Sequence, residues 1–192
     1  MSPYGIPLDL LPFGEINENN EDAREGAAIL SINLDGFPEV YTNGLILTEI
    51  ENDKIMICSI PSVVLLKLIA YDDRPENRPN DPLDIDSILK HYPTIEMELI
   101  WAEYTFLYEE DKEDLSSELI GIKVLGYEIS KLIHENKQLT HRLLSILDKA
   151  IDLSSDLAQQ MIQDAETETI ESKTNTLKKL KEGIQEGLKK YS

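Results

Sequence analysis

The order of predicted elements indicates an α+β fold, because short strands come early in the chain and helices come late. Strand-like runs rich in apolar and β-branched residues occupy residues 6–13, 45–50 and 54–60. Beyond these strands, apolar side chains recur at helical spacing. A chain of 192 residues is long enough for a domain with its own core. We therefore predict an α+β part over residues 1–93 and a helical region over residues 94–192.

The first predicted strand, residues 6–13, is apolar at most positions and is bounded by proline and by Gly14. The second and third strands are separated by three polar residues, 51–53, a spacing that suits a β-hairpin. Cys58 lies in the apolar second strand of this hairpin, so we expect a buried, inert thiol. A single cysteine excludes a disulfide framework.

Two helices are predicted after the hairpin. Ser59 or Ser62 can cap the first helix, which we expect to run to about residue 71. The second helix opens at Asp81, and Pro93 is expected to end it, because proline disfavours a helix interior.

The rest of the chain is predicted to be helical, at residues 95–108, 114–133, 138–152 and from about Thr169 onward. The last helix places apolar side chains at helical intervals between many lysines. It either docks on its own domain or acts as a partner-binding or RNA-steering helix. Gly183 and Gly187 are expected to weaken it, since each costs about 1 kcal/mol relative to alanine.

Charge and hydropathy restrict the class of protein. The formal net charge of −19 repels a phosphate backbone, so general nucleic-acid binding is not expected. The longest apolar run, residues 63–70, is interrupted by Lys67 and is far shorter than the ~20 residues of a membrane span. The first residues lack the basic and apolar regions of a secretory signal. We expect a cytoplasmic protein without membrane contact.

Two charged residues stand in apolar surroundings. Asp9 lies between Leu8 and Leu10 in a predicted strand, where an ionised carboxylate needs a cation or hydrogen-bond donors. It is either a metal-facing carboxylate or a structural residue held by backbone amides or by an arginine. Lys67 lies in a helix that is apolar on nearly every side, so we expect burial. It is either a snorkelling or ion-paired lysine, or it is directed at a ligand.

Three more charged residues could share a cleft with Lys67. Arg74 follows it by seven residues, which gives nearly the same angular position if the helix persists; the alternative is pairing with acidic neighbours. Asp81 and Asp84 share a helix face. The presence of Asp81 at the start of the helix can be explained by the helix dipole alone, which favours an acidic residue there. A Lys67–Asp84 ion pair would explain both residues without catalysis, and an active role for Asp84 is the alternative.

Other familiar site patterns are not supported. The chain contains one Asp-x-Asp sequence, Asp84-Ile85-Asp86. In a helix these two carboxylates point about 200° apart, so they cannot hold one metal ion. The three histidines lack metal-ligand spacing, and no glycine-rich phosphate loop is found.

Three ordered motifs carry a family resemblance: the apolar-Asp-apolar-apolar-Pro-Phe-Gly run at residues 8–14, the Lys67-Leu68-x-Ala70-x-x-x-Arg74 helix, and the Asp81-x-x-Asp84 helix start. Together they resemble the nucleotidyltransferase-like family of AbiEii/AbiGii-type toxins, over roughly residues 6–133. The resemblance implies a nucleotidyltransferase-like mixed sheet, present in part, followed by a C-terminal helical region.

The same resemblance implies roles for four residues. Asp9 takes the place of the family's third acidic position, as a catalytic carboxylate and a ligand of Mg²⁺. Lys67, Arg74 and Asp84 are implied to bind the nucleotide, with the lysine on its phosphates. The activity implied is transfer of NMP from an NTP to an RNA or protein acceptor, in a toxin of a toxin–antitoxin pair. Asn80 departs from the family pattern, in which many relatives carry lysine.

Family members also carry a Gly-Ser turn and an Asp-x-Asp strand, and no glycine of this chain is followed by serine. Three carboxylates usually hold the two divalent cations of nucleotidyl transfer, so we expect this chain to be inactive alone. The expected partners are an NTP in the complete protein and an antitoxin or a second copy. The alternative is a non-catalytic, degenerate relative that acts as a protein-interaction module.

Overall fold

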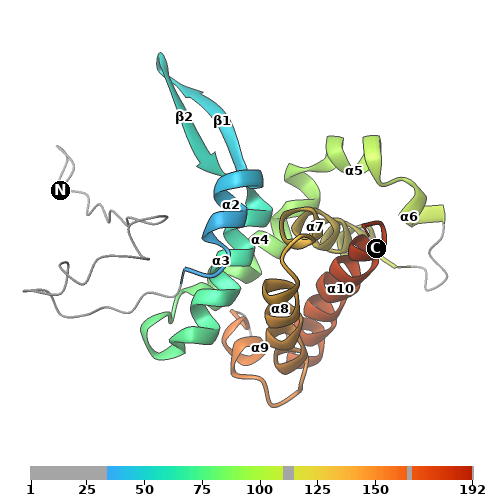
Figure 1. Ribbon diagram of the computed structural model, residues 1–192. Coiled ribbons are helices and arrows are strands. Elements are labelled where there is room, and N and C mark those ends of the chain that lie inside the picture. The colour runs from blue at the N-terminus through green and yellow to red at the C-terminus, as the bar shows by residue number, and fades with distance from the viewer. Residues whose placement is uncertain (1–33, 110–114, 164–165, 192) are drawn as a thin grey trace, which may run out of the picture.

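The computed structural model describes residues 34–109, 115–163 and 166–191. Within these ranges the protein is mostly helical and contains a two-stranded antiparallel sheet (Figure 1). The prediction of an α+β fold with a helical C-terminal region is confirmed in this general form. Asp9 and the strand predicted at residues 6–13 lie outside the described residues.

The predicted hairpin is present as strands β1 (Leu45–Ile50) and β2 (Asp53–Cys58). Their register pairs Leu45 with Cys58 at the base and Ile50 with Asp53 at the tip. The hairpin projects from the helical body (Figure 1). As a result Cys58 is exposed, and the prediction of a buried thiol is wrong.

A short helix, α2 (Phe37–Asn43), leads into the hairpin and was not predicted from the sequence. Gly36 and Pro38 are typical of a turn, yet proline is tolerated in the first turn of a helix because its missing amide has no partner there. Gly36 precedes α2 with φ 87°, a conformation that favours glycine.

Helices α3 (Ile60–Asp73) and α4 (Asp81–Ile95) follow, joined through the short 3₁₀ helix η2 (Pro75–Asn77). Ser59 caps α3 as predicted, its side chain accepting a hydrogen bond from the Ser62 amide. The prediction that Pro93 ends the next helix is wrong, because α4 continues past it. Pro93 packs closely on Gly121, where an added Cβ would lie 2.6 Å from the proline Cβ.

The remaining helices are α5 (Met97–Glu103), α6 (Phe106–Glu109), α7 (Ser117–Ile133), α8 (Lys137–Ala150), α9 (Asp156–Gln160) and α10 (Ile170–Lys189). The helix predicted at residues 95–108 is thus two short helices that follow the end of α4. The start of α10 is confirmed, since Thr169 and Ser172 form a reciprocal capping box. No helix in the described ranges is long and apolar enough to cross a membrane.

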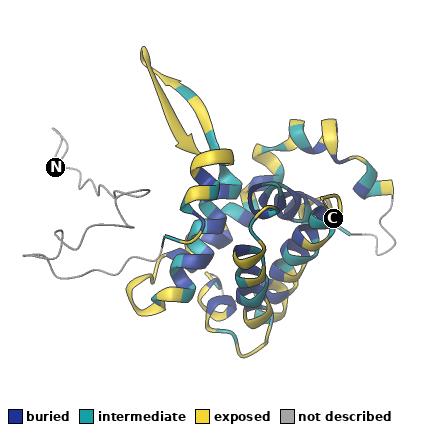
Figure 2. Ribbon diagram, viewed as in Figure 1, coloured by how far each residue is buried: buried dark blue, intermediate teal, exposed yellow. Residues whose placement is uncertain are grey.

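Buried apolar side chains form a core cluster that lies mainly between α3, α4, α7, α8 and α10 (Figure 2). Leu65 and Leu89 contribute to it from one side of the predicted boundary at residue 93, and Leu125 and Leu180 from the other. The boundary itself stays a prediction.

Helices α7 and α10 pack with their backbones in close approach. A Cβ added at Gly183 would lie 2.0 Å from the Lys123 carbonyl oxygen, and one added at Gly126 would lie 2.3 Å from that of Leu180. The apolar face of α10 therefore docks on its own domain, through Leu180 and its neighbours. Gly183 was expected to weaken this helix because glycine has a low helix propensity. Its lack of a side chain is nevertheless what allows α7 and α10 to pack this closely.

We predict that Gly183→Ala destabilises the protein, although alanine is the better helix former. The added methyl must push α7 and α10 apart, and overpacking of this kind costs roughly 1–3 kcal/mol. Urea unfolding measures the change in free energy. Gln185→Ala, at an exposed position of α10, is the matched control and should be nearly neutral. A Gly183→Ala variant as stable as the wild type would contradict the close approach.

Candidate functional site

Three charged side chains meet where α3 packs on the start of α4. The Lys67 Nζ atom donates to Asp81 Oδ1 at 2.7 Å and to Asp84 Oδ2 at 2.8 Å. These carboxylates lie 14 and 17 residues further along the chain. The predicted Lys67–Asp84 pair is confirmed, and Asp81 is a second partner of the same ammonium.

Local structure explains this convergence. Helix α3 ends at Asp73, and the connection through η2 brings the chain back so that Asp81 is the first residue of α4. Asn80, before it, makes no side-chain capping bond. A carboxylate in the first turn of a helix is favoured by the helix dipole. Asp81 and Asp84, one turn apart, both reach the lysine.

The three side chains differ in exposure. The exposed fractions are 25% for Lys67, 9% for Asp81 and 54% for Asp84. Lys67 is therefore partly exposed and not enclosed as expected, because its ammonium reaches the surface between the helices. The pair with Asp81 is the buried one, and the pair with Asp84 is open to solvent.

The charges of the cluster do not balance, since two carboxylates surround one ammonium. Burial alone would lower the pKa of Lys67, but the hydrogen bonds to Asp81 and Asp84 and the negative charges of these groups raise it above its ordinary value. Lys67 is thus charged at neutral pH. The second oxygen of Asp81, Oδ2, is buried and has no hydrogen-bond partner among the described residues.

Arg74 lies just beyond the end of α3 and caps it, its amide donating to the Ala70 carbonyl at 3.2 Å. Its backbone has left helical geometry, with φ −149° and ψ 66°. Arg74 was predicted to share the angular position of Lys67 only if the helix continued that far, and α3 ends at Asp73. The role of Arg74 in nucleotide binding stays a prediction.

No group of three or more histidine, cysteine, aspartate or glutamate side chains is arranged to hold a metal ion within the described residues. Asp81 and Asp84 share an ammonium where a cation could otherwise lie. Asp9 is not among the described residues, so its assignment as a Mg²⁺ ligand stays a prediction.

Sequence reasoning missed a second charged cluster, between α4 and α10. Asp86, only 2% exposed, accepts from Lys173 Nζ at 2.7 Å and lies 2.7 Å from Lys90 Nζ. Both lysines also pair with Glu168. The predicted divergence of Asp84 and Asp86 is confirmed, since each faces a different helix.

A signal for this cluster was present in the sequence. Lys173 lies between Ile170 and Leu177 at the i+3 and i+4 spacing of the apolar stripe of α10. A lysine on an apolar stripe requires a buried partner. The sequence did not identify Asp86 as that partner because the two residues lie 87 positions apart.

Comparison of the chain with protein-family models, curated protein sequences and solved structures yields no match.

We predict that Lys67→Met lowers the free energy of unfolding by about 1–3 kcal/mol, because the buried Asp81 carboxylate loses its charged donor. Asp84→Asn should cost less than about 1 kcal/mol, since this partner is exposed. Chemical denaturation of the three proteins at neutral pH measures both changes. Equal losses in the two variants would contradict the assignment of Asp81 as the structural partner.

The pH dependence gives an independent measurement of the same interaction. Because the pKa of Lys67 is raised on folding, its contribution to stability is complete below the ordinary lysine pKa and is lost as the pH rises through the raised value. The stability difference between wild type and Lys67→Met should therefore shrink in strongly alkaline solution. A difference that grows with pH would mean that Lys67 is neutral in the fold.

Proposed function

We propose that this chain belongs to a nucleotidyltransferase-like protein of toxin–antitoxin type, in which NMP is transferred from an NTP to an RNA or protein acceptor. The observation that supports the proposal is the convergence of the Lys67 and Asp81-x-x-Asp84 motifs on one partly exposed ammonium. These are two of the three motifs that carry the resemblance. Their meeting in space is expected if they serve one site.

The unequal carboxylates suit a lysine that binds phosphate. Asp81, which is buried, holds the ammonium in position, whereas Asp84 is exposed and can be replaced by a ligand oxygen. A lysine ammonium is a compact donor to phosphate. Mg²⁺ held with the help of Asp9 would supply the positive charge that stabilises the reacting oxygens. Arg74 would contribute a second cation.

We predict that the chain binds NTPs through Lys67. Lys67→Met should weaken binding at least tenfold, because the phosphate loses its donor. The resemblance implies that Asp84 binds the nucleotide, but its exposed pair with Lys67 makes it a competing anion instead, so Asp84→Asn should bind as tightly as the wild type or more tightly. Titration calorimetry with each NTP in MgCl₂ measures the affinities, and Lys178→Met, at an exposed lysine of α10, is the matched control.

Two results would count against this proposal. If the wild type binds no NTP, or if Lys67→Met and Lys178→Met bind equally well, Lys67 is a structural lysine. Labelled product from the wild-type chain with RNA, Mg²⁺ and labelled NTP would contradict the expectation that the chain is inactive alone.

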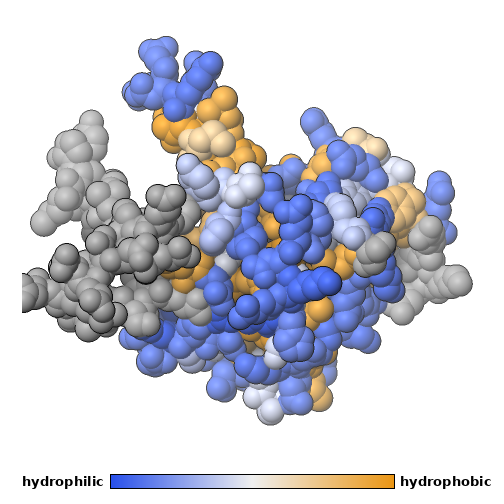
Figure 3. Space-filling model, viewed as in Figure 1, coloured by the Kyte–Doolittle hydropathy of each residue, from blue (hydrophilic) through white to orange (hydrophobic). Residues whose placement is uncertain are grey.

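A second candidate function, a protein-interaction module, is favoured by the hairpin. Its exposed apolar side chains are Ile46, Leu47, Ile50, Ile55, Met56 and Ile57, and they form a hydrophobic surface on the projecting hairpin (Figure 3). The strand register places the four isoleucines on one face and the other two side chains on the opposite face. A sheet that is apolar on both faces is normally covered on both.

The hairpin would bind a protein that presents an apolar segment flanked by basic residues. The tip of the hairpin carries Glu49, Glu51 and Asp53, with Lys54 as the basic neighbour. The net charge of −19 opposes association with a second copy of the chain and favours a basic partner. The helical region is a poorer candidate surface, because the apolar face of α10 is buried on α7.

We predict that Ile57→Ser weakens binding of such a partner at least tenfold and leaves the fold stable, because the side chain is exposed. A protein that binds to the immobilised wild type and not to the immobilised Ile57→Ser variant would be identified and purified. Its affinity for the wild type and for the variant would then be measured at low and at high salt. Thr48→Ser, on the same hairpin face, is the matched control. Light scattering that shows a dimer of the chain, abolished by Ile57→Ser, would assign the surface to a second copy instead.

A further inference from the structure

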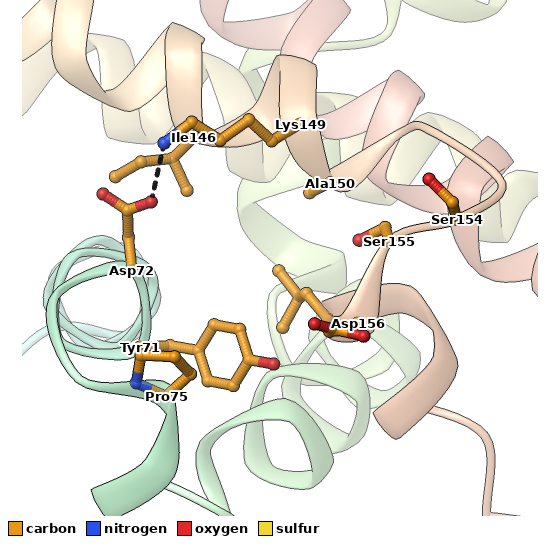
Figure 4. Close-up of a pocket in the computed structure, with 10 residues that line it drawn as sticks. Tyr71, Asp72, Pro75, Ile146, Lys149, Ala150, Ser154, Ser155 and Asp156 are labelled. Atoms are coloured by element: carbon orange, nitrogen blue, oxygen red, sulfur yellow. Dashed lines mark hydrogen bonds and ion pairs between the residues drawn. The ribbon is translucent and has the colours of Figure 1, made fainter.

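A pocket of about 310 Å³ lies between α3, α8 and α9, apart from the Lys67 cluster (Figure 4). Its apolar lining comes from the ring of Tyr71 and from Pro75, Ile146, Ala150 and Leu157. The volume falls at the lower end of the range of small-molecule sites.

The Tyr71 side chain brings a buried hydroxyl to the pocket. The residue is only 7% exposed, yet its hydroxyl has no hydrogen-bond partner among the described residues. The side chain crosses the pocket and directs this hydroxyl toward Asp156 (Figure 4). Buried polar atoms are nearly always hydrogen-bonded, so an unpartnered hydroxyl in a pocket indicates a group that binds there.

Most of the other polar groups around the pocket are already engaged. Ser155 accepts a hydrogen bond from the Ala158 amide at 3.3 Å, as the cap of α9. Ser154 donates to Asp152 at 2.6 Å. Lys149 donates to Asp72 at 3.0 Å.

Asp156 is exposed at the first position of α9 and faces the tyrosine. Burial, together with the charge of Asp156, raises the pKa of Tyr71, so the hydroxyl stays protonated and neutral at physiological pH. It can both donate and accept a hydrogen bond. The carboxylate of Asp156 can only accept.

The charge of the pocket selects the kind of ligand. Asp72 is paired with the Lys149 ammonium at 3.0 Å and with Arg142 at 3.9 Å, whereas Asp156 has no ion pair among the described residues and keeps an uncompensated negative charge. An organic cation suits this electrostatic environment, whereas a carboxylate or phosphate ligand does not.

We infer that this pocket binds a small protonated amine with an apolar body. The ammonium donates to the Asp156 carboxylate and to the Tyr71 hydroxyl oxygen, and the apolar body lies against Ile146, Ala150 and Leu157. This site uses neither Lys67 nor its partners, so the inference stands independently of the proposed nucleotide site.

Benzylamine tests the inference, with benzyl alcohol and phenylacetate as neutral and anionic analogues of similar shape. NMR shift titration of the full chain should show saturable binding of benzylamine at resonances of α3 and α9. Phenylacetate should not bind, and benzyl alcohol should bind at least tenfold more weakly than benzylamine.

Two variants identify the groups responsible. Asp156→Asn should weaken benzylamine binding at least tenfold, and Tyr71→Phe should weaken it several-fold. Tyr71→Phe removes a hydroxyl without a partner in the described fold, so the variant should stay folded. Glu135→Gln, which removes one negative charge between α7 and α8, controls for net charge and should bind as the wild type does.

The inference is wrong if benzylamine shows no saturable shift, if phenylacetate binds as well as benzylamine, or if Asp156→Asn and Glu135→Gln behave alike. Circular dichroism of each variant confirms that a loss of binding is not a loss of fold.

Discussion

The close approach of α7 and α10 is the constraint on which much of the described fold depends. Because Gly126 and Gly183 lack side chains, the two helices meet backbone to backbone. This contact holds α10 so that Lys173 reaches Asp86 on α4. Helix α4 in turn carries Asp81 and Asp84 to Lys67. This contact between residues distant in the sequence thus positions the charged cluster of Asp86 and Lys173, whereas the candidate site at Lys67 is formed by the direct packing of α3 on α4.

Features determined by neighbouring residues were predictable from the sequence. The hairpin, the Ser59 cap and the start of α10 at Thr169 depend on side chains within a few positions. Features that depend on distant packing were not. Helix α4 continues past Pro93, which packs on Gly121 of α7. Cys58 is exposed because the hairpin projects from the helical body. Hydrophobicity alone does not indicate which apolar strand is covered.

In the candidate site, too, the features set by local sequence motifs were predictable and those set by packing between helices were not. The Lys67–Asp84 pair could be predicted because an apolar helix with one lysine and a helix start with carboxylates are each recognisable motifs. The greater burial of Asp81 could not, since it depends on how α4 packs. The pocket beside Tyr71 was also beyond the sequence, because it is assembled from three helices. Metal binding at Asp9 and the role of Arg74 stay predictions.

The hairpin is attached to the rest of the protein mainly at its base, where Leu45 packs against the core. Its other strand residues add little to the buried cluster. Local opening costs least where buried contacts are few. The strands can therefore separate and re-form while the helices stay folded, and their backbone amides should exchange with solvent much sooner than those of α7 and α10. The hairpin and the helical body are, in this sense, separate cooperative units within one chain.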